Sequence, residues 1–263
     1  TNPELMTELQ TNSYLIVSTS TINNNDIQLH LKYRHPIHIG GPDWTLINEY
    51  TFKEVFGYNK ETALEQRPKN AFIRYGILAP TSLSLLPGYL TKQPIPAKIW
   101  ILHTWGVNLE SRSTTDGKYV FKDSDWFKNY CVLMKKMFEI VGRACDKVYE
   151  KTGKKKFVVL RITGLGLGAW ATAIPKKKLV QTQYLIYLTD LLKTRNKWLK
   201  IRYPQFPNNI TLDIKLLNSN EIVEQNHDPF GFGAPEPPLN PKTHEFIIVN
   251  AWDDGSFIGN AGS

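Results

Sequence analysis

The chain has 263 residues, of which 41% are hydrophobic, so it can bury a substantial core as one large α/β domain. Its 32 basic and 24 acidic residues give a net charge of +8, which favours anionic partners, but no nucleic-acid recognition motif accompanies that charge. Two cysteines exclude a disulfide framework, and the lack of any apolar stretch of roughly 18 residues excludes a membrane span, so we expect a soluble, cytoplasmic protein without nucleic-acid or membrane partners.

The first part of the chain predicts irregular α+β structure. Residues 27–33 alternate polar and apolar side chains as a strand does, and residues 52–56 favour a short helix. Proline and asparagine residues interrupt the rest of this part. We therefore expect residues 1–97 to form an N-terminal extension packed on a core domain made of residues 98–263.

A β-α-β unit is predicted next. Residues 99–105 favour a strand, and the acidic cluster at residues 123–125 is typical of a helix start. Apolar residues then recur at three- and four-residue spacing, namely Phe127, Tyr130, Cys131, Met134, Phe138, Val141, Cys145 and Val148. Such a stripe is typical of a helix packed on a core rather than of a cofactor site. Residues 157–162 form another apolar run, which predicts a buried strand parallel to the first.

Helices and strands continue to alternate along the remainder. Apolar residues from Leu179 to Leu191 predict a helix, and residues 210–217 and 246–250 predict two further strands. Residues 228–238 are rich in proline and glycine and predict an irregular loop, either a lid over a substrate or a rigid surface connection. The alternation predicts an α/β fold.

A glycine turn follows the predicted strand at residues 157–162, with the sequence Thr163-Gly164-Leu165-Gly166-Leu167-Gly168-Ala169-Trp170. Glycine permits positive φ and close approach, so successive backbone amides can form a nest for a diphosphate. A helix starting just beyond the turn would add the positive end of its dipole. A tight strand-to-helix turn without any ligand would contain the same glycines.

Gly164, Gly166 and Ala169 also match the loose G-x-G-x-x-A fingerprint of dinucleotide-binding proteins. That fingerprint requires an acidic residue about twenty positions further on, at the end of the next strand. Asp190 has this spacing but lies in the predicted helix, and the next predicted strand begins only at Ile210. The sequence therefore disfavours a nicotinamide-dependent oxidoreductase.

Polar residues and a glycine gather at the end of the last predicted strand and just beyond it. They are Asn250, Asp253, Asp254, Ser256, Gly259 and Asn260. Loops at the carboxyl ends of strands bind ligands in α/β sheets, so these residues are candidates for a sugar site. A plain acidic turn would use the same residue types.

Three motifs between Lys98 and Asn260 resemble those of the macrodomain family. Val249-Asn250-Ala251-Trp252-Asp253 is similar to the family's strand-end signature V-N-A-x-N/D, residues 164–170 to its diphosphate-binding loop, and residues 256–260 to its ribose-wrapping loop. The pattern N-A-W-D-x-x-S-x-x-G-N, preceded by residues 105–111, is similar to a divergent group of macrodomain-like ADP-ribosylhydrolases. The family's triple glycine is replaced by Gly259-Asn260-Ala261-Gly262, and the further acidic residues expected of the group do not follow before Ser263.

The resemblance implies a three-layer α/β/α fold with a mixed sheet. It also implies removal of ADP-ribose from arginine side chains of a modified protein, ubiquitin being the substrate of one bacterial member. The amides of Gly164 to Trp170 would take the diphosphate, Asn250 and Asp253 would face the distal ribose, and Gly259 and Asn260 would close over it. A non-catalytic ADP-ribose reader would use the same pocket.

Cleavage of an N-glycosidic bond passes through an oxocarbenium-like state that a carboxylate can stabilise. We assign this role to Asp253, and contact with the guanidinium leaving group to Asp254. Trp252 either stacks on the ligand or packs in the core, while Asn108 and Glu110 either line the cleft or cap a turn. The six histidines show no metal-ligand spacing beyond one pair, so we expect neither a metal nor a cofactor.

Overall fold

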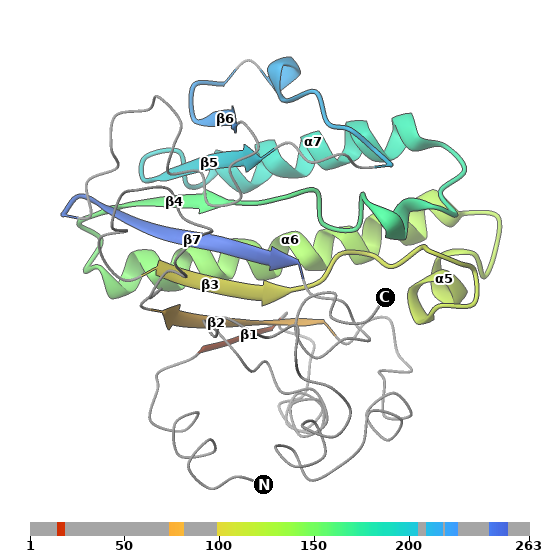
Figure 1. Ribbon diagram of the computed structural model, residues 1–263, viewed down its shortest axis with the longest axis horizontal. Coiled ribbons are helices and arrows are strands. Elements are labelled where there is room, and N and C mark those ends of the chain that lie inside the picture. Colours follow the sequence, from red (N-terminus) through yellow and green to blue (C-terminus); the bar gives the residue numbers. More distant parts are fainter. Residues whose placement is uncertain are drawn as a thin grey trace, which may run out of the picture.

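The computed structural model describes residues 15–18, 74–81, 99–204, 209–217, 219–225 and 242–251, whose strands form one sheet (Figure 1). The strands are β1 (Leu15–Ser18), β2 (Tyr75–Thr81), β3 (Ile99–Thr104), β4 (Phe157–Arg161), β5 (Leu199–Pro204), β6 (Ile222–Gln225) and β7 (His244–Ala251). Their order is β1-β2-β3-β7-β4-β5-β6, with β2 antiparallel to both neighbours and all pairs from β3 to β6 parallel. The fold is therefore a mixed α/β sheet with helices, as predicted.

Strand β7 comes last in the chain but lies in the middle of the sheet. It pairs in parallel with β3 on one side and with β4 on the other. The predicted β-α-β unit is thus parallel, but its two strands are separated by β7. This insertion brings a C-terminal strand end between two loops from the middle of the chain.

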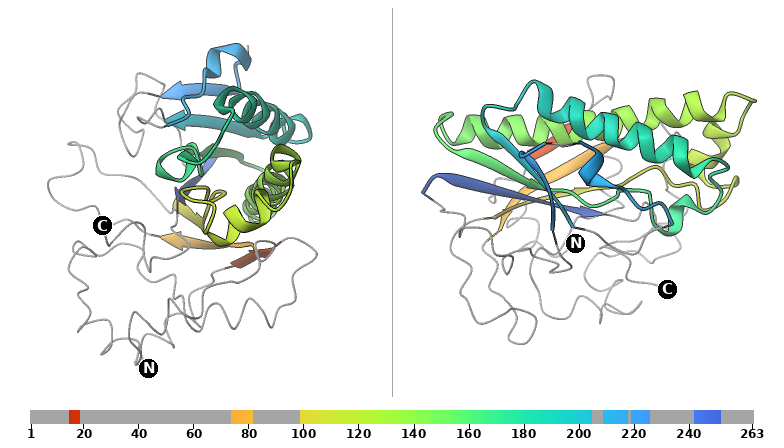
Figure 2. Two further views of the ribbon diagram at one scale, coloured as in Figure 1. Left: turned by 90° about the vertical axis from the view of Figure 1, so that its right-hand side faces the viewer. Right: turned by 90° about the horizontal axis from the view of Figure 1, so that it is seen from above.

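Two long helices cover one face of the sheet, α6 (Trp126–Lys151) and α7 (Lys177–Lys193) (Figure 2). The apolar stripe predicted on α6 faces the core; all its members are buried except Phe127 and Cys131, which are half-buried. Each fully buried apolar side chain contributes about 1.5–3 kcal/mol, so this stripe is a main source of the core's stability. Asp125 is the N-cap residue of α6, but the side chain that bonds there is Asp123, which accepts from the Asp125 amide and from Asn129 Nδ2, both at 2.9 Å.

The strand predicted at residues 210–217 is wrong. Ile210, Leu212 and Ile214 are buried in alternation, as in a strand, but the segment joins no ladder and ends in the 3₁₀ helix η3 (Ile214–Leu217). The Ile210 amide instead donates to the Leu167 carbonyl at 3.0 Å, so the segment covers the core beside the glycine turn. The next strand along the chain after β4 is instead β5, which pairs with β4 in the sheet and is followed there by β6.

Residues of the predicted N-terminal extension contribute to the sheet, because β1 and β2 extend it beyond β3. The predicted strand at residues 27–33, the short helix at 52–56 and the loop at 228–238 lie outside the described residues. Among the described helices, none combines the length and the apolar character needed to cross a membrane.

Candidate functional site

Three predicted ligand-binding segments meet at the carboxyl edge of the parallel strands, on the right-hand side of Figure 1. Strand β7 pairs His103 of β3 with Asn250, and Arg161 of β4 with Ile248. The end of β7 at Asn250 therefore lies between the loop that follows β3 and the glycine turn that follows β4. The other predicted C-terminal site residues lie outside the described residues, namely Trp252, Asp253, Asp254, Ser256, Gly259 and Asn260.

Two leucines anchor the glycine turn in the core. The side chains of Leu165 and Leu167 are buried. The Leu165 amide donates to the Thr163 carbonyl at 2.8 Å and to the Tyr184 hydroxyl at 3.0 Å. The Leu167 amide donates to the Gly164 carbonyl at 2.9 Å. Both leucine amides are engaged within the protein, so the diphosphate contacts predicted for this turn must come from its other amides.

Residues on either side of the two leucines keep their amides available. Gly164, Gly166 and Gly168 are half-buried, and Ala169 is exposed. Gly166 has a φ of 75°, a conformation that L side chains rarely adopt, so the turn requires glycine there. Within the described part of the chain, the amides of Gly164, Gly168 and Ala169 donate to no acceptor. Amides that alternate with buried anchors can hold an anion, because the anchors fix their direction.

The predicted helix dipole does not support this turn. Only the three-residue 3₁₀ helix η2 (Ala169–Ala171) follows directly, and α7 begins at Lys177. The first turn of α7 carries lysines and no acidic residue. An anion at the turn would therefore be held by individual amides rather than by a helix terminus.

Tyr184 of α7 holds the glycine turn in shape. Its side chain is fully buried, and its hydroxyl donates to the Thr163 carbonyl and accepts from the Leu165 amide, both at 3.0 Å. Its ring packs edge-on against Phe138 with centroids 5.0 Å apart. Burial raises the pKa of Tyr184 well above its usual value, so the hydroxyl keeps the proton that it donates.

Replacing Tyr184 by phenylalanine is expected to lower the free energy of unfolding by about 1 kcal/mol and to loosen the turn, because both hydrogen bonds are lost while the ring remains. Urea denaturation measures the first effect, and hydrogen exchange at the Leu165 amide measures the second. Tyr187→Phe is the matched control, since its hydroxyl donates to the Cys131 carbonyl at 3.1 Å, within the helix pair. Equal exchange at Leu165 in both variants would contradict the role of Tyr184.

The loop after β3 packs backbone against backbone on the glycine turn. A Cβ atom added to Gly106 would lie 2.2 Å from the Gly166 amide nitrogen, so only glycine permits this approach. The Leu109 amide donates to the Trp170 carbonyl, and the Ala173 amide donates to the Leu109 carbonyl, both at 2.9 Å. The two loops therefore form one unit.

A buried ion pair fixes that unit to the sheet. Arg74, 1% exposed, donates from Nη1 to the Gly106 carbonyl at 3.0 Å and pairs through Nη2 with Asp116 Oδ2. Asp116, in the short helix α5 (Thr115–Val120), also accepts from the Asn108 amide at 2.8 Å. The position of the loop after β3 is thus set by charges buried beneath it.

Asn108 and Glu110 were predicted either to line the cleft or to cap a turn. Asn108 is buried, and its Oδ1 accepts from the Glu110 amide at 3.1 Å, which is a turn-capping contact. Its carbonyl accepts from Thr114 Oγ1 at 2.8 Å. Glu110 is exposed, so of the two side chains it is the one that reaches solvent.

Sequence reasoning missed Arg74, Asp116, Tyr184, Arg161 and Arg202. Arg74 and Asp116 are 42 residues apart, and no local pattern links them. Arg161 and Arg202 did carry a signal, since each is a charged residue within an apolar strand pattern.

Strand β5 is the next strand along the chain after β4, where a dinucleotide-binding protein would place the acidic residue that holds the adenosine ribose. The strand contains no acidic residue, so it does not favour the dinucleotide alternative.

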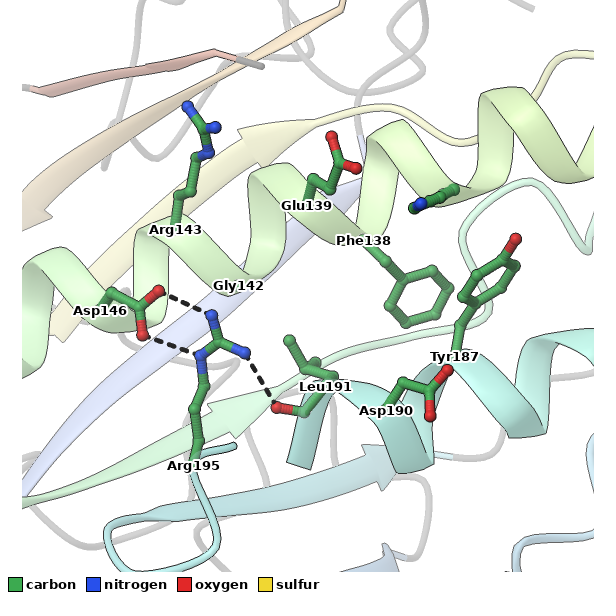
Figure 3. Close-up of a pocket in the computed structure, with 10 residues that line it drawn as sticks. Phe138, Glu139, Gly142, Arg143, Asp146, Tyr187, Asp190, Leu191 and Arg195 are labelled. Atoms are coloured by element: carbon green, nitrogen blue, oxygen red, sulfur yellow. Dashed lines mark hydrogen bonds and ion pairs between the residues drawn. The ribbon is translucent and has the colours of Figure 1, made fainter. Parts of the chain in front are cut away.

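A groove of about 390 Å³ lies away from this edge, between α6 and α7 (Figure 3). Its charged side chains balance, with Lys135, Arg143 and Arg195 against Glu139, Asp146 and Asp190. Arg195 forms two hydrogen bonds with Asp146, at 2.8 and 2.6 Å. None of the predicted site residues lines this groove, and the Arg195–Asp146 pair links α6 to the residues that follow α7.

The described residues provide neither a reactive thiolate nor a group of three metal-ligating side chains. Burial raises the pKa of Cys145 to about 12 and that of Cys131 to about 11, so both thiols are protonated at neutral pH. The sequence matches no protein-family model and no curated protein.

Proposed function

We propose that the protein is an ADP-ribosylhydrolase with a three-layer, macrodomain-like fold, and that it releases ADP-ribose from arginine side chains of a modified protein, ubiquitin being one candidate. The observation that carries the proposal is the meeting of the glycine turn with the end of β7 at Asn250. In this proposal the amides of Gly164, Gly168 and Ala169 bind the diphosphate, and Asn250 binds the distal ribose.

Asp253 and Asp254, two and three residues after the end of β7 at Ala251, are the proposed catalytic residues. Asp253 activates a water molecule and stabilises positive charge on the ribose as the C1–N bond breaks. The bonding electron pair leaves with the guanidinium nitrogen, which takes up a proton, and the water oxygen forms the new bond to C1. Asp254 contacts the departing guanidinium. The products are free ADP-ribose and unmodified arginine.

The binding half of the proposal is tested by calorimetric titration with ADP-ribose, NAD and ATP in parallel. We expect ADP-ribose to bind, because its diphosphate and terminal ribose match the two halves of the site. NAD binding accompanied by redox turnover of a substrate would instead favour the dinucleotide-dependent alternative.

The catalytic half is tested with an arginine-ADP-ribosylated protein. Asp253→Ala is expected to lower the rate of ADP-ribose release by roughly 10²–10⁴-fold while ADP-ribose still binds. Asp190→Ala removes an exposed carboxylate on α7 and is the matched control, with release unchanged. If the wild-type protein binds ADP-ribose but releases none, the protein is a reader module.

A further inference from the structure

Two arginines lie side by side near the carboxyl edge of the sheet, next to the glycine turn. Arg161 ends β4, and its neighbour in register on β5 is Arg202. Neighbouring strands are about 4.8 Å apart, so the backbones of the two arginines are adjacent and their side chains leave the sheet next to each other. Both arginines are largely buried, with 6% and 7% of their surfaces exposed.

The arginines lie on the sheet face opposite α6 and α7. The hydrophobic core beneath those helices contains Val158 and Leu160 of β4 and Leu199 and Ile201 of β5. Successive side chains of a strand alternate between faces, so Arg161 and Arg202 must lie on the other face. The Ile162 amide donates to the Arg202 carbonyl at 3.0 Å and continues the strand pairing up to the start of the turn.

We propose that Arg161 and Arg202 form the charged half of an anion subsite for a diphosphate, with the amides of the glycine turn as its neutral half. Guanidinium groups bind phosphate oxygens in a bidentate manner, and two adjacent guanidinium groups match the charge of a diphosphate better than one. This inference rests on the proposed function, because it assigns the diphosphate of ADP-ribose to the same edge of the sheet.

The test is calorimetric titration of the full chain and of the Arg161→Met and Arg202→Met variants, with inorganic pyrophosphate and with ADP-ribose. Each variant is expected to bind both ligands about ten- to a hundredfold more weakly and with a weaker dependence on salt. Lys200→Met is the matched control, because it removes one positive charge from the same face of β5, two residues before Arg202, and is expected to bind both ligands as the wild type does.

Circular dichroism melting of each variant separates folding from binding. Should a methionine variant not fold, the corresponding Arg→Lys variant keeps the charge but loses the bidentate fork, and it is expected to bind pyrophosphate several-fold more weakly. Folded arginine variants that bind both ligands like the wild type would overturn the inference and leave the proposed function intact. Wild-type binding of pyrophosphate without ADP-ribose, lost in the arginine variants, would support the subsite and overturn the proposed function.

Discussion

Asp116→Asn is expected to lower the free energy of unfolding by about 3–5 kcal/mol, because it leaves the charge of Arg74 buried without its carboxylate. The side chains of this pair are only 1% and 6% exposed, so water cannot replace the lost partner. Asp116 also accepts from the Asn108 amide, and the substitution weakens that bond to the loop after β3. Urea denaturation monitored by circular dichroism measures the loss.

Asp190→Asn is the matched control for this substitution. It breaks the ion pair between Asp190 and Lys193, whose side chains are 46% and 67% exposed, respectively. An exposed ion pair contributes less than about 1 kcal/mol. The double variant Arg74→Met/Asp116→Leu is expected to be more stable than Asp116→Asn, because it removes the orphaned charge as well. Losses of similar size for Asp116→Asn and Asp190→Asn would show that burial of the first pair is unimportant.

Gly106→Ala is the second change with a large expected effect. The added Cβ would lie 2.2 Å from the Gly166 nitrogen and 2.4 Å from the Leu165 carbonyl carbon, both of them backbone atoms. Backbone cannot move aside by a rotamer change, so the loop after β3 and the glycine turn must separate. We expect a loss of stability of about 1–3 kcal/mol and a loss of ADP-ribose binding.

Gly142→Ala is the control for this change because it adds the same methyl group within α6. The nearest atom there is Nη2 of Arg195, at 3.0 Å, which bonds Asp146 at 2.6 Å but belongs to a side chain, so a small side-chain movement can make room for the methyl group. Alanine is also favoured over glycine in a helix, so any loss of stability should be smaller than that of Gly106→Ala. Thermal melting and ADP-ribose titration of both variants provide the comparison. Wild-type affinity in Gly106→Ala would mean that the contact between the two loops is not needed for binding.

The regular elements with strong periodicity were predicted correctly. The three- and four-residue spacing that defined α6 is local, and the helix buries nearly all of that stripe. The strand predicted at residues 210–217 failed because alternating burial does not require a ladder, and this segment buries alternate residues by lying over the core. Strand β5 was missed although Leu199, Ile201 and Tyr203 alternate, because basic residues stand between them.

The candidate site could be predicted only in outline. The glycines marked the turn, but which of its amides remain available depends on the burial of Leu165 and Leu167 and on the bonds from Tyr184. The same holds for Arg161 and Arg202, which become neighbours only when β4 pairs with β5. The catalytic roles of Asp253 and Asp254, which lie beyond Ala251, are predictions from the sequence.

The sequence by itself determined the two long helices α6 and α7, the strands β3, β4 and β7, and the position of the glycine turn, because those features follow from spacing within a few residues. Only the tertiary structure decided that β7 lies between β3 and β4, that Gly106 touches Gly166, and that Arg74 pairs with Asp116. The reason is physical: propensity and periodicity act within one segment, whereas strand order, backbone contacts and buried ion pairs depend on segments that are far apart in the chain and meet only when it folds.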